Sequence, residues 1–401
     1  MSTCSSDVLV VGGSVAATRA AEIVVRKAPQ LSVVVVSDES HAPYERPPLS
    51  KTDLDDAMDL DALTYPTVAT LRDAGVEFEL ATRAERLDVG TRTVTTTTGS
   101  VEYGALVIAT GCEPVIPSLL RGLDDVYALR CYEDAVALRA AVAGSDTAVA
   151  IVGAGFIGGE FAATLAKQER DVALIDLAPK PLGRFGDAVA ASYKQLHRDA
   201  GVTLHLGTAA VDVTHDGGRR ELVLDDDTRV RADVILLGVG VRPAVDWLAD
   251  SGLTLDNGIV CDTTLRAADR VYAAGDAIRW TNARFGSTMR IEHWTNAAQQ
   301  GRVAGMNAAN AVLGESPVEC ANVPYFWSDQ HGVRIQFAGH RTGDEEIVES
   351  HDDSGSLYLY RRGDEVTGAL AFERRTQFVK LRAALKTPLP WETARELAEL
   401  A

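Results

Sequence analysis

Residues 149–176 read VAIVGAGFIGGEFAATLAKQERDVALID, and this stretch decides the fold. An apolar run that predicts a buried strand ends in a glycine-rich turn. A segment with small residues at helical spacing then leads to a second apolar run. Gly153 permits the tight turn, Gly155 lets the backbone approach a pyrophosphate, and Gly158 lets the helix pack close to the sheet. The stretch therefore predicts a β-α-β unit that holds a dinucleotide at the N-terminus of its helix, where unpaired N–H groups attract phosphate.

An acidic residue ends the second strand of this unit. A carboxylate at the position of Asp176 can accept hydrogen bonds from both hydroxyls of a ribose. Its charge would repel the 2′-phosphate of NADPH, so we expect NADH to be preferred. Lys180 and Arg184 follow downstream and would weaken that preference.

An earlier stretch, residues 7–38, repeats the pattern. A strand leads into the turn Gly12-Gly13-Ser14, a helix rich in alanine follows, and a β-branched strand precedes Asp38. Ser14 and Ala17 stand where glycine is usual, but a serine hydroxyl can face phosphate and alanine still permits close helix packing. This stretch is either a second dinucleotide site or a structural β-α-β unit. Two dinucleotide sites in one chain would indicate a protein that moves a hydride from one cofactor to the other.

Two glycine turns indicate how the chain is divided into domains. Residues 106–111 and 234–240 are each an apolar strand that ends in such a turn, and they flank the second β-α-β unit. We therefore expect an α/β fold in which a second Rossmann-like domain is inserted into the first, followed by a C-terminal α+β domain. The predicted domains are 1–111 with 241–317, then 112–240, and finally 318–401. In the last domain the pattern predicts strands at 333–337, 357–360 and 366–372 and a final helix at 376–386.

The composition excludes several classes of function. A net charge of −18 argues against nucleic acid as the main partner. No apolar run approaches the roughly 20 residues of a membrane span, and no basic region precedes the first apolar run. We therefore expect no membrane association, no secretion signal and a cytoplasmic location. The cysteines are widely spaced without a CxxC pair, which predicts free thiols and no metal site. They are Cys4, Cys112, Cys131, Cys261 and Cys320.

Three further segments carry candidate functional or solvent-exposed residues. Residues 41–51 read HAPYERPPLSK, in which the paired prolines fix an extended loop before Lys51, although an ordinary surface loop would have the same composition. Residues 270–276 form an apolar strand that ends at Gly275-Asp276, where a carboxylate beside a flexible turn suits a ribityl hydroxyl. Residues 53–61 are rich in aspartate and are expected to be solvated.

Taken in order, the motifs resemble those of the FAD-dependent, NADH-linked ferredoxin reductases of bacterial oxygenase systems. This family lies within the pyridine nucleotide-disulfide oxidoreductase superfamily. The carrying motifs are GGSVAA, PYERPPLSK, LVIATG, VGAGFIGGE, LLGVGVRP, VYAAGD, IEHWTNA and PYFWSDQ. PYERPPLSK and PYFWSDQ are specific to the family, whereas the glycine turns are shared by the superfamily. The resemblance implies a glutathione-reductase-like fold with an FAD domain in two pieces, an inserted NADH domain and a C-terminal domain over the flavin.

The resemblance also implies roles for individual residues. The expected flavin contacts are Gly12, Ser14, Ala16, Asp38, Arg46, Lys51, Arg130, Gly275, Asp276, Trp294 and Trp327. The expected NADH contacts are Gly153, Gly155, Ile157, Gly158, Glu160 and Asp176. Lys51 and Glu160 are similar to a catalytic ion pair beside the reactive edge of the flavin in related enzymes. Arg302 resembles a partner-docking position, and we add Arg374 and Arg375 from the basic segment 374–386, which is otherwise a solvated helix face.

The absence of a thiol motif narrows the expected chemistry. Disulfide reductases with this double fold need a redox cysteine pair, and no such pair occurs here, so electrons would leave the flavin directly. The expected function is NADH oxidation with single electrons passed to a ferredoxin, or to a rubredoxin, that serves a monooxygenase or dioxygenase. The expected state is a monomer. The alternatives are a reductase of a small one-electron acceptor, a quinone or oxygen, and a redox sensor similar to apoptosis-inducing factor.

Overall fold

The computed structural model describes residues 2–51, 58–144, 146–216 and 219–400. The described chain forms two compact units, each built from three segments. Unit 1 comprises Met1–Glu45, Leu60–Glu113 and Arg242–Phe326, and unit 2 comprises Arg46–Asp59, Pro114–Val241 and Trp327–Ala401. Most of the aspartate-rich segment expected to be solvated lies outside the described residues.

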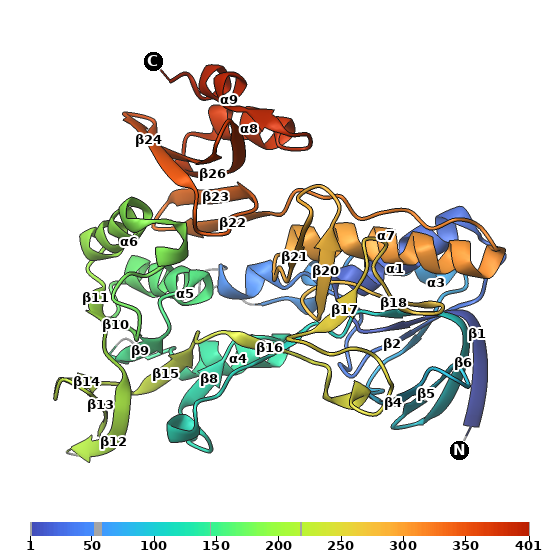
Figure 1. Cartoon of the computed structure of the whole chain (residues 1–401). Coiled ribbons are helices and arrows are strands. Elements are labelled where there is room, and N and C mark those ends of the chain that lie inside the picture. Colours follow the sequence, from blue (N-terminus) through green and yellow to red (C-terminus); the bar gives the residue numbers. More distant parts are fainter. Residues whose placement is uncertain (1, 52–57, 145, 217–218, 401) are drawn as a thin grey trace. The chain divides into compact units, whose positions relative to one another are not determined.

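Unit 1 is built on a sheet whose central strands are parallel (Figure 1). The strand order is β18-β19-β6-β1-β2-β3, with β5 beside β6 and β4 beside β5. Strand β1 pairs in parallel with both β2 and β6, as the first β-α-β motif predicts. The strands are β1 (Ser2–Val11), β2 (Val33–Val36), β3 (Glu77–Glu79), β4 (Ala84–Asp88), β5 (Thr93–Thr96), β6 (Gly99–Ile108), β18 (Arg266–Ala268) and β19 (Val271–Ala273). A smaller sheet contains β17 (Ile259–Cys261), β20 (Ile278–Asn282) and β21 (Ser287–Met289).

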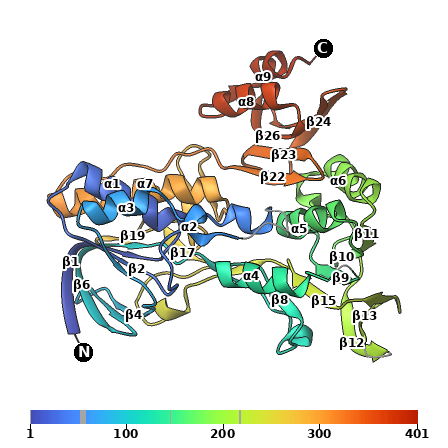
Figure 2. The same ribbon diagram turned by 180° about the vertical axis from the view of Figure 1, so that it is seen from behind.

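Helices α1 (Val15–Lys27), α3 (Thr67–Asp73) and α7 (Trp294–Leu313) lie on one side of the large sheet, as Figures 1 and 2 both show. Two glycines let α1 and α7 approach closely. A Cβ on Gly301 would lie 2.2 Å from the carbonyl oxygen of Ala16, and one on Gly305 would lie 2.4 Å from that of Ala20. Since both obstacles are backbone atoms, only glycine fits at these two positions. The remaining helices of unit 1 are the short α2 (Leu60–Leu63) and η4 (Asp246–Leu248).

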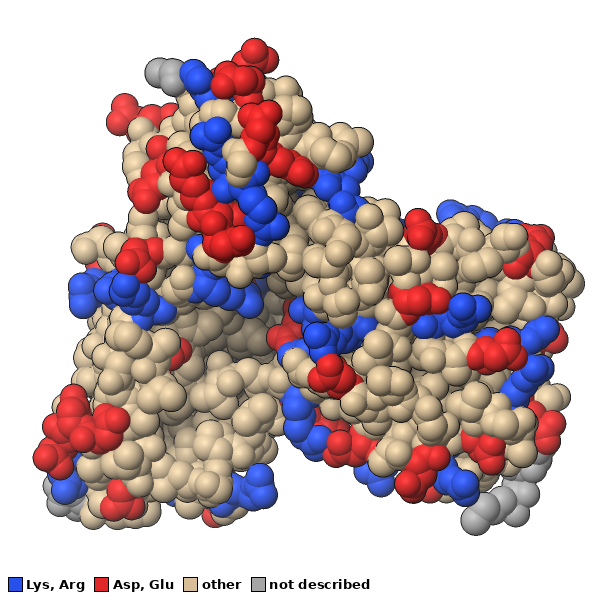
Figure 3. Space-filling view, in the orientation of Figure 1, with Lys and Arg blue, Asp and Glu red and all other residues tan. Residues whose placement is uncertain are grey.

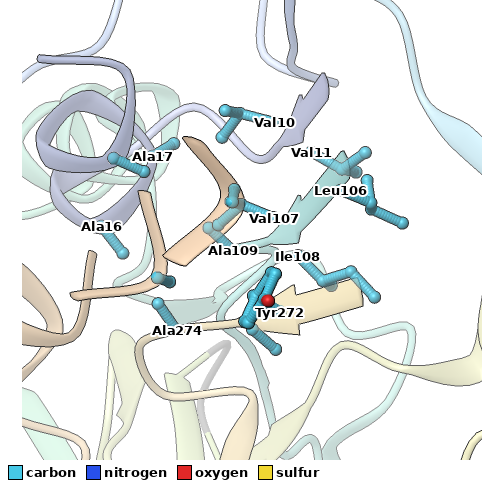
Figure 4. Close-up of a cluster of buried hydrophobic side chains, with 14 of the residues drawn as sticks. Val10, Val11, Ala16, Ala17, Leu106, Val107, Ile108, Ala109, Tyr272 and Ala274 are labelled. Carbon is cyan, nitrogen blue, oxygen red and sulfur yellow. The ribbon is translucent and has the colours of Figure 1, made fainter. Parts of the chain in front are cut away.

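The core of unit 1 includes side chains on both faces of the large sheet and on the helices beside it (Figure 4). Side chains from α1, from β1 and β6, and from the β19 region gather there. The labelled residues are at most 7% exposed: Val10, Val11, Ala16, Ala17, Leu106, Val107, Ile108, Ala109, Tyr272 and Ala274. The core therefore holds β1, the turn that follows it and α1 as one rigid element.

Unit 2 contains the second β-α-β motif in a fully parallel sheet of order β11-β10-β9-β15-β8. One face packs against α4 and α5, while the other packs against a small antiparallel sheet of β12, β13 and β14. Because both faces are covered, the strands read as continuous apolar runs. The strands are β8 (Val126–Ala128), β9 (Val149–Val152), β10 (Val172–Asp176), β11 (Thr203–Leu206), β12 (Ala210–Asp216), β13 (Arg219–Leu224), β14 (Arg229–Arg231) and β15 (Val234–Leu237). The helices are η1 (Pro47–Ser50), η2 (Ser118–Leu120), α4 (Tyr132–Ala141), α5 (Phe156–Lys167), η3 (Gly183–Phe185) and α6 (Asp187–Asp199), and the chain passes between the units at β7 (Cys112–Pro114) and β16 (Val241–Pro243).

The last part of the chain forms an antiparallel sheet of order β22-β23-β26-β25-β24, with β27 beside β26. Its strands are β22 (Tyr325–Gln330), β23 (Val333–Gly339), β24 (Glu346–Asp352), β25 (Gly355–Arg362), β26 (Glu365–Glu373) and β27 (Leu389–Pro390). The helix α8 (Arg375–Ala384) was predicted, but the chain also has α9 (Trp391–Ala398), so 376–386 is not the final helix. Only Ala394 and Ala398 of α9 are buried, so its apolar face is small. The mixed α/β fold class is confirmed. No helix among the described residues is long and apolar enough to cross a bilayer.

Candidate functional site

The first nucleotide turn, in unit 1, leaves no room for a side chain. Gly12 has a φ of +130°, and a Cβ there would lie 2.2 Å from the carbonyl oxygen of Ala109. Its N–H donates to the carbonyl of Val36, which fixes the turn against the end of β2. Ser14 is the N-cap residue of α1, and Ala16 lies buried in the first turn. The backbone N–H groups at the start of α1 are thus available for an anionic group.

When equivalent positions are compared, the predicted acid of the first β-α-β motif lies one position later in the chain than the acid of the second motif. Gly12 donates to Val36, whereas the equivalent Gly153 donates to Ile175, so Ser37 corresponds to Asp176. Asp38 follows one residue later, and its side chain is exposed. The carboxylate therefore approaches any ribose from a different backbone position than Asp176 does.

The turn at Gly275-Asp276 is held by a glutamine that the sequence analysis missed. The N–H of Gly275, which has a φ of +85°, donates to Gln300 Oε1 at 2.9 Å. Gln300 is fully buried on α7, and its Nε2 has no hydrogen-bond partner among the described residues. A buried amide nitrogen without a partner is costly, and a bound polar group or water would satisfy it. Trp294, at the start of the same helix, donates from Nε1 to the hydroxyl of Tyr65 at 3.1 Å.

The second nucleotide turn, in unit 2, has the geometry that its glycines predict. Gly153 has a φ of +113°, and a Cβ there would lie 2.3 Å from the carbonyl oxygen of Gly238. A Cβ on Gly158 would lie 2.1 Å from the carbonyl oxygen of Gly153, so α5 could not pack as it does with any larger residue. Gly155 is the N-cap residue of α5. Ile157, one residue into the helix, is 44% exposed, which leaves an apolar side chain beside the turn.

Asp176 is held in place by two backbone groups. Its Oδ2 accepts from the N–H of Ala154 at 2.6 Å, and its Oδ1 accepts from the N–H of Ala178 at 2.7 Å. Of the two cations that would favour a 2′-phosphate, Lys180 is bound to Asp187 at 2.7 Å and Arg184 stacks over the ring of Phe185. Both cations therefore have partners of their own within unit 2.

Lys51 and Glu160, both in unit 2, form the expected ion pair. Glu160 lies on the second turn of α5 and is 6% exposed, and Lys51 follows η1. Each oxygen of the Glu160 carboxylate also accepts a hydrogen bond from a serine. Ser50 donates to Oε2 and Ser328 donates to Oε1, each at 2.6 Å. A buried carboxylate persists as an anion when it is paired and hydrogen-bonded in this way. The sequence analysis missed both serines.

Two other predicted flavin contacts are also brought together in unit 2. The guanidinium of Arg46 donates to the carbonyl of Arg130 at 2.6 Å. The N–H of Arg130 in turn donates to Asp134, which caps the start of α4. Trp327 lies on β22 next to Ser328 and is partly buried.

The basic segment at the C-terminal end differs from the docking surface that we predicted. Arg374 is 4% exposed and pairs with Asp352 at 2.7 Å, so its guanidinium does not face a partner. Arg375 pairs with Glu373, and Lys380 pairs with Glu399. Folding therefore brings acids to a segment that has none of its own, and Figure 3 shows cations and acids interspersed on the face in view. Arg302, in contrast, is exposed on α7.

The five cysteines, all of them among the described residues, form no disulfide with one another, and only Cys4 is exposed. Burial raises the pKa of Cys131 and of Cys320 to about 12, so both thiols stay neutral near pH 7. Buried Cys112 lies with its sulfur 3.3 Å from the carbonyl oxygen of Asp276. Among the described residues, no cluster of His, Cys, Asp and Glu could hold a metal ion.

Known proteins share this arrangement over nearly the whole chain. The family profile described as pyridine nucleotide-disulphide oxidoreductase matches residues 6–301, and the one described as reductase C-terminal matches residues 325–399. The ferredoxin–NAD(+) reductase component of 3-phenylpropionate/cinnamic acid dioxygenase from Photorhabdus laumondii is 30% identical over 389 residues, which cover 95% of this chain and 96% of that protein. Apoptosis-inducing factor 3 of Homo sapiens is 31% identical over 381 residues, which cover 90% of this chain and 60% of that protein.

A solved structure gives the same result in three dimensions. Putidaredoxin reductase, in its covalent complex with putidaredoxin, superposes with a TM-score of 0.89 at 27% identity and covers 96% of this chain and 94% of that one. The resemblance deduced from the motifs is thereby confirmed. The chain belongs to the pyridine nucleotide-disulphide oxidoreductase family and carries the C-terminal domain of its reductases.

Proposed function

We propose that the protein is an FAD-dependent NADH:ferredoxin reductase that serves a monooxygenase or dioxygenase. The observation that carries the proposal is the buried Lys51–Glu160 pair in a chain with two nucleotide turns and no paired cysteines. FAD, when bound, supplies the chemistry that accepts a hydride from NADH and releases electrons one at a time. The ferredoxin reductase component from Photorhabdus laumondii supports the assignment of the acceptor.

The residues of unit 1 fit FAD. The turn at Gly12 admits no side chain, and the N-terminus of α1 offers N–H groups to a pyrophosphate through Ser14 and Ala16. Asp38 would accept from the adenosine ribose. Gly275 and Asp276 would receive the ribityl chain, and beside them lies the Gln300 Nε2, which has no hydrogen-bond partner among the described residues. Trp294 of unit 1 is a further contact that we propose. The family resemblance also implies contacts from Arg46, Lys51, Arg130 and Trp327, which belong to unit 2.

The residues of unit 2 fit NADH. Gly153, Gly155 and Gly158 would let the backbone approach its pyrophosphate, and Asp176 would accept from its ribose hydroxyls. The exposed side chain of Ile157 would pack against an apolar face of the coenzyme.

Lys51 would act as a fixed cation at the reacting edge of the flavin. The anionic Glu160 holds its ammonium in place, and the two serine hydroxyls hold Glu160. A positioned charge of this kind stabilises negative charge that develops during hydride transfer, and the protein does not need to reorganise to supply it.

Electrons would leave to a small iron–sulfur carrier that docks at the exposed Arg302, with Arg375 as a second contact. A redox sensor is the second candidate, which the 31% identity to human apoptosis-inducing factor 3 favours. We also propose a cytoplasmic location, supported by the free state of the five cysteines.

The test is NADH-driven reduction of cytochrome c by the FAD-loaded protein, with and without a panel of ferredoxins and rubredoxins. We expect the rate to depend strictly on an added carrier. Rapid reduction of a quinone or of oxygen without a carrier would contradict the proposal. Slow turnover with every acceptor, together with a change in partner binding on reduction, would favour the sensor.

A further inference from the structure

Glu160 is the end of a line of buried hydrogen bonds that crosses unit 2. Ser328 Oγ lies 2.6 Å from Glu160 Oε1, and Gln330 Nε2 lies 2.9 Å from Ser328 Oγ. Gln330 Oε1 lies 3.0 Å from His197 Nε2, and His197 Nδ1 lies 3.0 Å from His331 Nε2. Ser328, Gln330 and His197 are at most 1% exposed, whereas His331 is partly exposed in the turn after β22.

The chemistry of the groups fixes one direction for the whole line. A carboxylate only accepts, so the hydroxyl of Ser328 donates to Glu160 and must itself accept from the amide of Gln330. The carbonyl of Gln330 then faces His197, which must carry its proton on Nε2 and leave Nδ1 bare. His331 completes the line by donating from Nε2 to that bare nitrogen. Reversing any member would set two donors or two acceptors against each other.

The protonation state of His197 agrees with this direction. Burial, together with the neighbouring His331, lowers the pKa of His197 to about 4, so the ring is neutral near pH 7. Burial also lowers the pKa of His331. Two neutral rings can share one hydrogen bond, whereas a charged His197 would have no acceptor role to play toward His331.

A glycine beyond the nucleotide fingerprint makes room for the line. A Cβ on Gly159 would lie 2.0 Å from the hydroxyl of Tyr193 and 2.6 Å from Gln330 Oε1. Tyr193 donates to the carbonyl of Gly155 at 3.1 Å, and its ring meets that of His197 edge-on at 4.6 Å. The second glycine of the pair at 158–159 therefore serves the approach of α6 and β22 to α5, rather than the binding of a nucleotide.

We propose that Ser328, Gln330 and His197 are positioning residues that keep the carboxylate of Glu160 aimed at Lys51. The proposal rests on the proposed function of the Lys51–Glu160 pair. The titratable groups that face Glu160 are Lys51 and Tyr193, and His197 and His331 act on it through Gln330. Without these hydrogen bonds the carboxylate is no longer held toward Lys51, so a step that needs a positioned Lys51 slows.

The first experiment observes the line directly, without turnover. The FAD-loaded protein is labelled with ¹⁵N-histidine, and the His197 signals are assigned by their loss in His197→Gln. We expect the Nε2–H tautomer of a neutral ring at pH 6.5, and a mixture of tautomers in Gln330→Leu. An Nδ1–H tautomer or an imidazolium at that pH in the parent protein would overturn the proposal.

The second experiment measures anaerobic flavin reduction by NADH in His197→Phe, Gln330→Leu and Ser328→Ala. We expect the limiting rate of flavin reduction to fall about tenfold, with the Kd for NADH unchanged. The conservative His197→Gln should recover most of the rate, since its amide can still donate to Gln330. Ser192→Ala is the matched control. Ser192 lies on α6, as His197 does, but its hydroxyl is hydrogen-bonded to that of Tyr358 at 3.0 Å and is not part of the line.

Limiting rates equal to that of Ser192→Ala in all three variants would overturn the proposal. If His197→Phe does not fold, Ser328→Ala tests the same carboxylate by deleting a single hydroxyl. If the parent protein is not reduced by NADH at all, the proposed function fails, while the tautomer of His197 still decides whether the line exists.

Discussion

Ser328 donates a hydrogen bond at 2.6 Å to Glu160, a residue that precedes it by 168 positions in the chain. The C-terminal sheet thus contributes directly to the carboxylate that pairs with Lys51. A substitution in any of these three residues should therefore change the same kinetic step.

Lys51→Met should slow flavin reduction by NADH at least about tenfold, because it removes a positioned cation and leaves Glu160 without its counter-charge. Stopped-flow absorbance under anaerobic conditions measures the step. Lys27→Met is the matched control: Lys27 also forms an ion pair, with Glu315, and its side chain is 25% exposed against 23% for Lys51. Equal rates in both variants, with FAD retained, would remove Lys51 from the mechanism.

Asp176→Ala should raise the use of NADPH relative to NADH by about tenfold, since the charge that repels a 2′-phosphate is lost. The ratio of kcat/KM for the two coenzymes measures it. Asp176→Asn keeps the shape but not the charge, and should give an intermediate ratio. An unchanged ratio in the alanine variant would show that the carboxylate does not select the coenzyme.

Gly301→Ala should lower the free energy of unfolding by about 1–3 kcal/mol, because the new Cβ meets the backbone of α1. Urea denaturation of the FAD-loaded protein measures the change. At Gly90 a Cβ would lie 3.4 Å from its nearest neighbour, so Gly90→Ala should be close to neutral. Equal effects at the two sites would mean that the helices can separate at little cost.

The stability of the protein should fall between pH 7 and pH 5, in part through His197. An unfolded histidine binds a proton near pH 6.5, whereas the folded His197 does so only near its pKa of about 4. The unfolded state therefore binds more protons over this range, and acid favours unfolding. We expect His197→Gln to lose about 2 kcal/mol less than the parent protein between pH 7 and pH 5. Urea denaturation measures the two losses. Equal losses of unfolding free energy in the parent protein and in His197→Gln would show that His197 binds its proton at a similar pH in the folded and unfolded states.

Arg302→Ala should raise the KM for a ferredoxin about fivefold without changing reduction of a small acceptor such as ferricyanide. Arg374→Ala should instead lower the melting temperature and leave that KM unchanged, because its guanidinium is buried against Asp352. If Arg374→Ala instead changed the KM for the ferredoxin and left the melting temperature unchanged, Arg374 would belong to the docking surface.

Local backbone requirements were the part of the fold that could be predicted. Gly153 predicts a tight turn and Gly158 predicts a close helix contact, and both requirements are local in the sequence. In the structure a carbonyl oxygen lies against each glycine. Asp176 and the ion pair followed from motifs with a fixed spacing or a family resemblance. The roles that we assigned to them toward bound cofactors stay predictions.

Contacts between distant segments could not be predicted. In the sequence, nothing distinguishes Ser328, Gln330 and His197 from other polar residues. Only the packing of β22 and α6 against α5 joins them in one line of hydrogen bonds. In the sequence Arg374 belongs to a basic segment that predicts a helix. Its partner Asp352 lies at the end of β24, which the sequence did not indicate. Gln300 carries no signal either, since the turn that it supports lies 25 residues earlier in the chain, with β20 and β21 between them.

Both oxygens of Asp176 are anchored to main-chain N–H groups of its own unit. The side chain therefore has little rotational freedom left to lose. At the ribose contact that we propose for Asp176, most of the entropic cost of ordering would fall on the coenzyme rather than on the protein.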